Sequence, residues 1–267
     1  MGLILVTNDD GVHAPGLIAL FRAMKELGDA VIIAPDRERS AVGHALTMHR
    51  PLKVELLREN VYSINGTPTD CVAVGLSKIL PRKPDLIISG INRGANLGDD
   101  VTYSGTVSAA FEGTIMGIPS IAVSLDIHDE ASDITNPDAP SKPPHYETAQ
   151  HFAAQAARFV LANYLPYATL LNVNVPNIHK SEIKGVKVTA QSKRVYDESV
   201  HETRSPRGEL YYWIGGGKPS WTESEDADIK AVMNGFVSIT PIHINLTNFS
   251  AMQWLKERWA DTSGKTA

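Results

Sequence analysis

Two adjacent carboxylates follow the first apolar segment of the chain. Asp9 and Asp10 come directly after Leu-Ile-Leu-Val-Thr (residues 3–7) and are followed by Gly11. Successive side chains of a strand point to opposite faces, so both carboxylates can converge only if the strand ends there. Two carboxylates held close together repel each other unless a cation lies between them. The simpler alternative is that both aspartates only cap a turn.

Further oxygen-bearing side chains follow two other apolar segments. Ser40 comes after residues 30–34, and Asn92 comes after residues 85–89. In open α/β sheets ligands bind at the carboxyl ends of the strands, so we expect these side chains to lie near the two aspartates. Carboxylate, hydroxyl and amide oxygens suit a hard divalent ion such as Mg²⁺ or Mn²⁺ rather than zinc. The predicted ligands of one such ion are Asp9, Asp10, Ser40 and Asn92.

A predicted helix rich in small residues begins shortly after Asn92. Ser104, Gly105 and Thr106 form its start, directly after a loop rich in Gly and Asp. The free backbone N–H groups of a helix start bind anions, and Ser104 and Thr106 add hydroxyl donors. An ordinary N-cap is the alternative. Because this start follows the Asn92 segment so closely, we favour a phosphate site beside the metal site.

Three histidines, His13, His44 and His49, lie in predicted loops near the first two strand ends. One interpretation is that one of them donates a proton to a leaving oxygen or contacts the substrate. The alternative is that they are solvated or packed, and their role stays open.

The elements that must position these residues alternate between strands and helices. Short apolar runs are typical of strands buried on both faces, and they occur at 3–7, 30–34, 85–89, 120–124 and 170–175. Helices are predicted at about 17–27, 67–80, 104–116 and 147–163. Thr67, Pro68 and Asp70 carry the pattern of a capping box. This alternation predicts a doubly wound α/β fold with a mainly parallel sheet.

The alternation of strands and helices ends after residue 175. We predict an α/β catalytic core over 1–175, and over 176–267 a β-rich extension with a C-terminal helix, which is not an independent domain. The helix, at about 250–260, has Met252, Leu255 and Trp259 on one face. It docks either on its own subunit or on a partner subunit. Within the core, residues 126–146 predict a proline-rich surface loop that affects access to the site.

Composition excludes several classes of protein. The 267 residues carry a net charge of −5 with no long basic run, which argues against a nucleic-acid polymer as partner. The single cysteine, Cys71, excludes an internal disulfide. The chain has no apolar stretch long enough for a membrane span and no signal-peptide core at its start. We therefore expect a cytoplasmic protein that has no membrane partner.

Six motifs, in order, resemble those of the stationary-phase survival protein SurE family. The resemblance extends from the first strand to about residue 247 and is carried by Asn-Asp-Asp-Gly at 8–11, Ala-Pro-Asp-Arg through Ser at 34–40, Gly-Thr-Pro-Thr-Asp-Cys at 66–71, Ser-Gly-Ile-Asn-Arg-Gly at 89–94, Ser-Gly-Thr-Val at 104–107 and Val-Ser-Ile-Thr-Pro at 237–241. It implies a Rossmann-like core and a metal-dependent phosphatase acting on nucleoside monophosphates. It also implies a homodimer or homotetramer built by the β-rich C-terminal part.

The resemblance implies roles for individual residues. Asp9, Asp10, Ser40 and Asn92 match the metal ligands of that family. Asn96, Ser104, Gly105 and Thr106 match positions that line its phosphate site. The chain departs at Ala95, where the family often has proline, and this puts the rigidity of the loop in question. The implied activity is that of a 5'-nucleotidase, with 3'-nucleotides and short polyphosphate as further candidate substrates.

Asp9 and Asp10 are the expected catalytic residues. Our first hypothesis for the nucleophile is metal-activated water with an Asp as general base. The second is direct attack by one of the two carboxylates, which gives an aspartyl phosphate. Two other functions stay open: a non-catalytic nucleotide-binding module, and a haloacid-dehalogenase-like phosphatase. The latter needs Asp-x-Asp after the first strand, whereas here the aspartates are adjacent.

Overall fold

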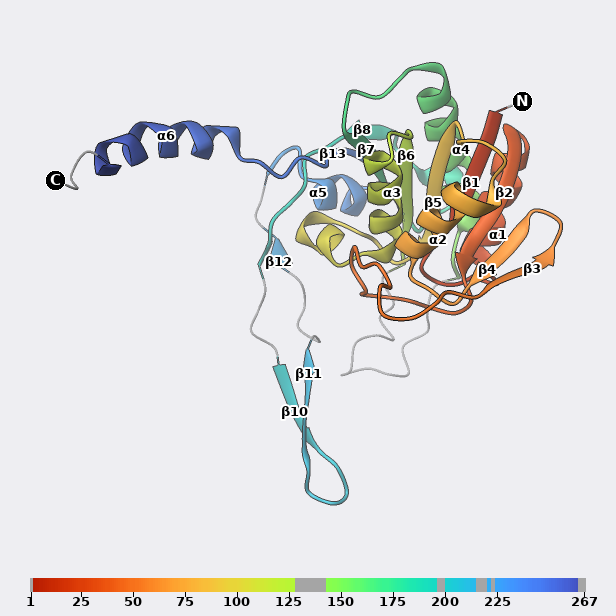
Figure 1. Ribbon diagram of the computed structural model, residues 1–267, viewed down its shortest axis with the longest axis horizontal. Coiled ribbons are helices and arrows are strands. Elements are labelled where there is room, and N and C mark those ends of the chain that lie inside the picture. The colour runs from red at the N-terminus through yellow and green to blue at the C-terminus, as the bar shows by residue number, and fades with distance from the viewer. Residues whose placement is uncertain (1, 128–142, 196–199, 215–219, 222–223, 264–267) are drawn as a thin grey trace.

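The first apolar segment forms the central strand β1 (Gly2–Thr7), and its alternating side chains enter two separate cores. Ile4 and Val6 belong to one core, and Leu3 and Leu5 belong to the other. Burial on both faces is typical of a parallel sheet that helices cover on both sides. The computed structural model, drawn in Figure 1, describes residues 2–127, 143–195, 200–214, 220–221 and 224–263.

One nine-stranded sheet has the strand order β3-β4-β2-β1-β5-β6-β7-β13-β8. The other strands of this sheet are β2 (Gly28–Pro35), β3 (Val54–Arg58), β4 (Val61–Ile64), β5 (Leu86–Arg93), β6 (Ser120–Asp126), β7 (Thr169–Pro176), β8 (Val186–Val188) and β13 (Val237–His243). Two of its pairs are antiparallel, β3 with β4 and β7 with β13, and the others are parallel. The predicted doubly wound, mainly parallel sheet is confirmed.

Helices cover both faces of the sheet (Figure 1). α1 (Pro15–Lys25) and α4 (Tyr146–Ala162) pack against each other on one face. α2 (Pro68–Val74), which continues as a π-helical turn over Gly75–Ile79, packs beside α3 (Gly105–Ile115) on the other face. The faces are therefore filled, and the edge formed by the carboxyl ends of the strands is left for ligands.

The capping box predicted at the start of α2 is confirmed, and it also holds a distant loop. The Thr67 side chain accepts from the Asp70 N–H, and the Thr67 N–H donates to Asp70 Oδ2 at 2.8 Å. The same carboxylate accepts from the Thr47 N–H at 2.9 Å and from the Thr47 hydroxyl at 2.6 Å. Asp70 thus ties the segment that follows Ser40 to α2.

Several elements of the structure have no counterpart in the sequence prediction, among them a hairpin and a short helix. The β3–β4 hairpin lies at the edge of the sheet, and all five β3 residues are exposed, so the segment has no buried-strand pattern. The short helix α5 (Asp228–Met233) lies within the predicted β-rich extension. Strand β5 is also longer than predicted, because it continues past an irregular register between Ser89 and Asn92.

The C-terminal part contributes strands to the main sheet. β13 pairs with β7, and β8 pairs with β13, so the expected boundary at residue 175 does not divide the sheet. Outside that sheet the described residues form β9 (Arg194–Val195), β10 (Val200–Arg204), β11 (Leu210–Ile214), β12 (Ser220–Trp221) and short 3-10 turns at Gly98–Thr102 and Lys180–Glu182. The role of 176–267 in assembly stays a prediction.

The predicted C-terminal helix is present as α6 (Phe249–Ser263). In Figure 1, α6 and the β10–β11 hairpin both extend away from the sheet. Met252, Leu255 and Trp259 are exposed, so in the described part of the chain this face of the helix is not buried against the body of its own subunit. Most of the predicted loop at 126–146 lies outside the described residues. No helix in the described part of the chain is long and apolar enough to cross a membrane.

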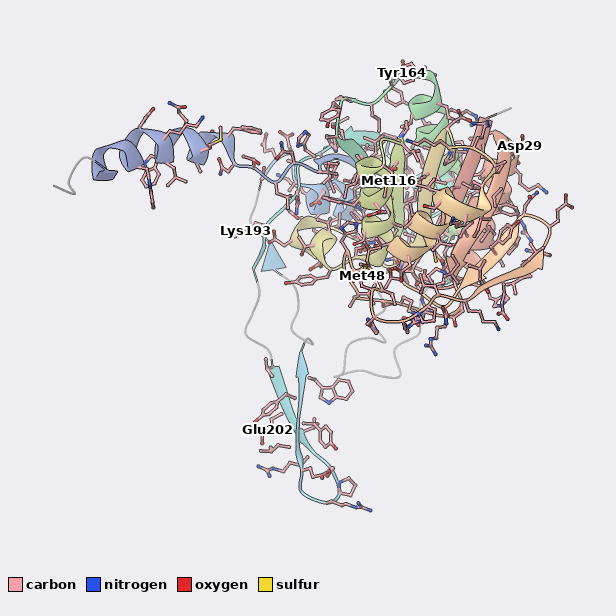
Figure 2. The ribbon with its side chains drawn as sticks, in the orientation of Figure 1. Asp29, Met48, Met116, Tyr164, Lys193 and Glu202 are labelled. Carbon is pink, nitrogen blue, oxygen red and sulfur yellow. The ribbon has the colours of Figure 1, made fainter. Side chains whose placement is uncertain are left out.

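We expect Asp70→Ala to destabilise the protein by about 3 kcal/mol, because three hydrogen bonds to a buried carboxylate are lost. The measurement is the free energy of unfolding in urea. Asp29→Ala is the matched control, because Asp29 is exposed at the periphery of the sheet (Figure 2) and its loss should cost no more than about 0.5 kcal/mol. Equal costs for the two variants would show that Asp70 does not hold the loop.

Candidate active site

The chain leaves β1 in a turn that brings both aspartates to the carboxyl end of the sheet. Gly11 has φ +99°, and a Cβ at this position would lie 3.0 Å from the main-chain carbon of Arg37. The turn packs against the segment after β2, where the Arg39 N–H donates to the Asp9 carbonyl at 2.7 Å. The strand therefore ends at Thr7, before the two aspartates, and Gly11 allows the turn that follows.

The two carboxylates lie in a setting that disfavours their charges. Asp9 is buried, and this burial raises its pKa. Burial and the neighbouring Asp9 charge raise the pKa of Asp10 to about 6. Glu38 adds a smaller contribution in the same direction to both. A bound cation would offset this repulsion, which fits the predicted metal site.

The start of α3 packs directly against Asp9. The Thr106 hydroxyl and the Thr106 backbone N–H both donate to the Asp9 carboxylate. A Cβ on Gly105 would lie 2.8 Å from the Asp9 Cβ and 2.9 Å from its Oδ2, so only glycine fits this approach. Ser104 is an N-cap whose hydroxyl accepts from the Val107 N–H at 3.1 Å. This helix start therefore already faces one anion, the carboxylate of Asp9.

The other two predicted metal ligands each adjoin a residue that contacts an aspartate. Ser40 follows Arg39, whose N–H reaches the Asp9 carbonyl. Asn92 precedes Arg93, whose N–H donates to Asp10 Oδ2 at 3.2 Å. The Asn92 amide nitrogen donates to the Gly94 carbonyl at 2.9 Å, so the amide oxygen remains as the ligand atom. The fold thus brings the three strand ends together.

The donor set fits a hard divalent ion. Ser40 is exposed, and its hydroxyl donates to Glu38 Oε1 at 2.7 Å, which leaves the lone pairs of the hydroxyl oxygen for an ion. Among the described residues no three His, Cys, Asp or Glu side chains are grouped as metal ligands. Hydroxyl and amide oxygens would therefore have to complete the set begun by the two carboxylates, as oxygen-rich sites for such ions allow.

Asn96, predicted to line the phosphate site, is buried and tightly held. Its side-chain nitrogen donates to the Ser124 hydroxyl at 2.7 Å, and its main-chain groups bond to side chains of β7. Ala95 packs against the small apolar cluster that contains Leu97 and Ile229. The loop is thus held by packing at Ala95 and by hydrogen bonds at Asn96.

The three histidines differ in their surroundings. His44 Nε2 lies 2.8 Å from Oε2 of the buried Glu112, and its ring lies 5.4 Å from that of Phe111. These contacts hold the His44 loop to α3, although His44 is itself exposed, as are His13 and His49. A role of any of the three in the reaction stays a prediction.

Two residues near the aspartates were missed by the sequence analysis. Glu38 interacts with both charges, and its position two residues before Ser40 was the available signal. Tyr146 begins α4, and its pKa is raised by burial and by the Asp10 charge. No local pattern marks Tyr146, because its neighbour Asp10 is distant in the sequence.

Comparison with known proteins gives a consistent result. Residues 4–198 match the family model described as Survival protein SurE. The 5'-nucleotidase SurE of Geobacter sulfurreducens is 50% identical over 95% of this chain and 92% of its own length. That of Pelobacter propionicus is 51% identical over 94% of this chain and 96% of its own. The crystal structure of the SurE protein from Aquifex aeolicus is 43% identical, with a TM-score of 0.81, and the match covers 96% of this chain and 98% of that one.

The motifs, the sheet topology and these matches over nearly the full length together show that the chain belongs to the SurE family.

Proposed function

We propose that this protein is a metal-dependent 5'-nucleotidase, which hydrolyses nucleoside monophosphates to nucleoside and phosphate. The observation that carries the proposal is the pair of adjacent carboxylates, of which Asp9 is held against the start of α3 and Asp10 against the Arg93 N–H, both with raised pKa values. The relatives that are about half identical carry the name 5'-nucleotidase SurE, which supports this activity. Activity toward 3'-nucleotides and short polyphosphate, and the cytoplasmic location, stay predictions.

Asp9, Asp10, Ser40 and Asn92 are the proposed ligands of one Mg²⁺ or Mn²⁺ ion per subunit. When bound, such an ion polarises phosphorus and neutralises charge on the phosphoryl oxygens. The Thr106 hydroxyl fixes the orientation of the Asp9 carboxylate. The Arg93 N–H does the same for Asp10.

The phosphate group of the substrate is proposed to lie between Asn96 and the turn of Ser104, Gly105 and Thr106. The Asn96 amide nitrogen carries two hydrogens, and one of them goes to Ser124, so the second is available to a phosphoryl oxygen. Gly105 allows the close approach of Asp9 and begins α3, at the positive end of the helix. Such donors stabilise the charge that spreads over the phosphoryl oxygens in the transition state.

Water is our first choice of nucleophile. Asp10 is the proposed general base, because it is the more accessible carboxylate, whereas Asp9 is enclosed by Gly105 and Thr106. Direct attack by Asp9 or Asp10, as in a haloacid-dehalogenase-like enzyme, is the second choice. A non-catalytic nucleotide-binding module is the alternative to both.

A homodimer or homotetramer is proposed from the two projecting segments. The β10–β11 hairpin exposes Tyr211, Tyr212 and Trp213, and α6 exposes Met252 and Leu255. Exposed apolar surface of this extent is typical of a contact between proteins.

We expect Asp9→Asn to lower metal-dependent AMP hydrolysis by more than about 100-fold. Loss of a residue that only orients a metal ligand can cost roughly 100-fold, and loss of the ligand itself should cost more. Circular dichroism should be unchanged, because the substitution relieves repulsion between two neighbouring carboxylates. In the wild type, a chelator should abolish phosphate release, and excess Mn²⁺ should restore it.

Asp29→Asn is the control for this substitution. Wild-type turnover by Asp9→Asn would exclude the metal site, and AMP binding without phosphate release under any condition would favour the binding module.

Thr106→Val is expected to lower kcat/KM for AMP about 10- to 100-fold, because Asp9 loses the hydroxyl that orients it. The Mn²⁺ concentration for half-maximal activity should rise in parallel. Thr114→Val is the matched control, since Thr114 lies in the same helix and its buried hydroxyl bonds only to the Ala110 carbonyl in the described structure. If the two valine variants behave alike, Thr106 does not act through Asp9.

A further inference from the structure

Strand β7 carries two buried amides in a position where apolar side chains would be expected. Asn172 and Asn174 alternate with Leu171, Val173 and Val175, which pack in the core on the other face. Both asparagines are fully buried. A buried amide is costly unless its hydrogen bonds are made, so two of them in a central strand call for a specific partner.

That partner is the main chain of Asn96. The Asn96 N–H donates to Asn174 Oδ1 at 2.8 Å, and the Asn174 amide nitrogen donates back to the Asn96 carbonyl at 2.9 Å. The Asn172 amide nitrogen donates to the same carbonyl at 2.8 Å, and its own Oδ1 has no hydrogen-bond partner among the described residues. Asn174 is therefore the bidentate clamp, and the single bond from Asn172 duplicates one half of it.

The Asn96 side chain is fixed separately from its main chain. Ser124 of β6 lies opposite Asn174 in the sheet, and its hydroxyl accepts from the Asn96 amide nitrogen at 2.7 Å. One residue is thus held at its backbone by β7 and at its side chain by β6.

The buried polar surface continues past β7. Ser238 and Thr240 of β13 lie opposite Asn174 and Asn172, and both hydroxyls contact the Thr189 hydroxyl, at 2.7 and 2.8 Å. In the described part of the chain neither hydroxyl bonds to Asn96. Ser238 and Thr240 are therefore control positions, because they are as buried as the asparagines but are not hydrogen-bonded to the Asn96 loop.

We propose that Asn174 and Ser124 are positioning residues for phosphate binding, which act by fixing the main chain and the side chain of Asn96. The proposal rests on the proposed function, in which Asn96 donates to a phosphoryl oxygen. It adds that the Asn96 amide is oriented by residues of β6 and β7 and not by the loop that contains it. A misplacement of about 1 Å at such a group can cost up to about 100-fold.

The test compares Asn174→Ala, Ser124→Ala and Asn172→Ala by KM and kcat for AMP and by inhibition constants for inorganic phosphate and adenosine. Asn174→Ala should raise the KM and the phosphate inhibition constant about tenfold or more, with the adenosine constant within about twofold. Ser124→Ala should change the same two constants in the same direction, whereas Asn172→Ala should have less than a third of the effect. Ser238→Ala is the control, with all constants near those of the wild type.

Asn96→Ala and the double variant Asn96→Ala/Asn174→Ala separate the possible failures. If Asn174 acts through the Asn96 side chain, the double variant should be no worse than Asn96→Ala. Fully multiplicative effects, or equal changes in the phosphate and adenosine constants, would overturn the positioning role. An Asn96→Ala variant with normal phosphate inhibition would instead overturn the proposed phosphate site. Should Asn174→Ala not fold, Ser124→Ala decides, because unchanged phosphate inhibition in it contradicts the proposal.

Discussion

The approach of the α3 start to the Asp9 carboxylate is the contact on which the rest of the site depends. It requires a glycine at position 105, a hydroxyl at Thr106 and a turn at Gly11 after the end of β1. Desolvating two neighbouring carboxylates is unfavourable, and their raised pKa values express this cost. A cation bound between the buried Asp9 and the half-buried Asp10 would offset this cost.

Main-chain hydrogen bonds bring the three strand ends to this pair. The Arg39 N–H reaches the Asp9 carbonyl, and the Arg93 N–H reaches the Asp10 carboxylate. Hydrogen bonds to buried side chains then hold the loops in place. The Asp70 carboxylate accepts from the Thr47 N–H, and the Asn174 side chain accepts from the Asn96 N–H. Residues that would touch the substrate are thus supported by buried groups on regular elements, which can hold a site more precisely than loops alone.

The C-terminal part of the chain contributes to the core as well as projecting from it. β8 and β13 extend the sheet beyond β7. Asp228 of α5 accepts from the Gly98 N–H at 2.9 Å, close along the chain to Asn96. The same part also contains the β10–β11 hairpin and α6, which extend away from the body (Figure 1). One set of these elements therefore belongs to the sheet and its core, and the other set lies at the surface.

The sequence by itself determined the alternation of strands and helices, because buried strands and amphipathic helices leave local apolar patterns. It also determined the capping box at Thr67 and Asp70, and the oxygen-bearing residues after three strands. Only the tertiary structure decided that Asp70 holds Thr47, that Tyr146 lies near Asp10, and that Asn174 clamps Asn96. It also placed β8 and β13 in the main sheet. These contacts join residues far apart in the chain, and they depend on strand order and register, which local periodicity does not encode.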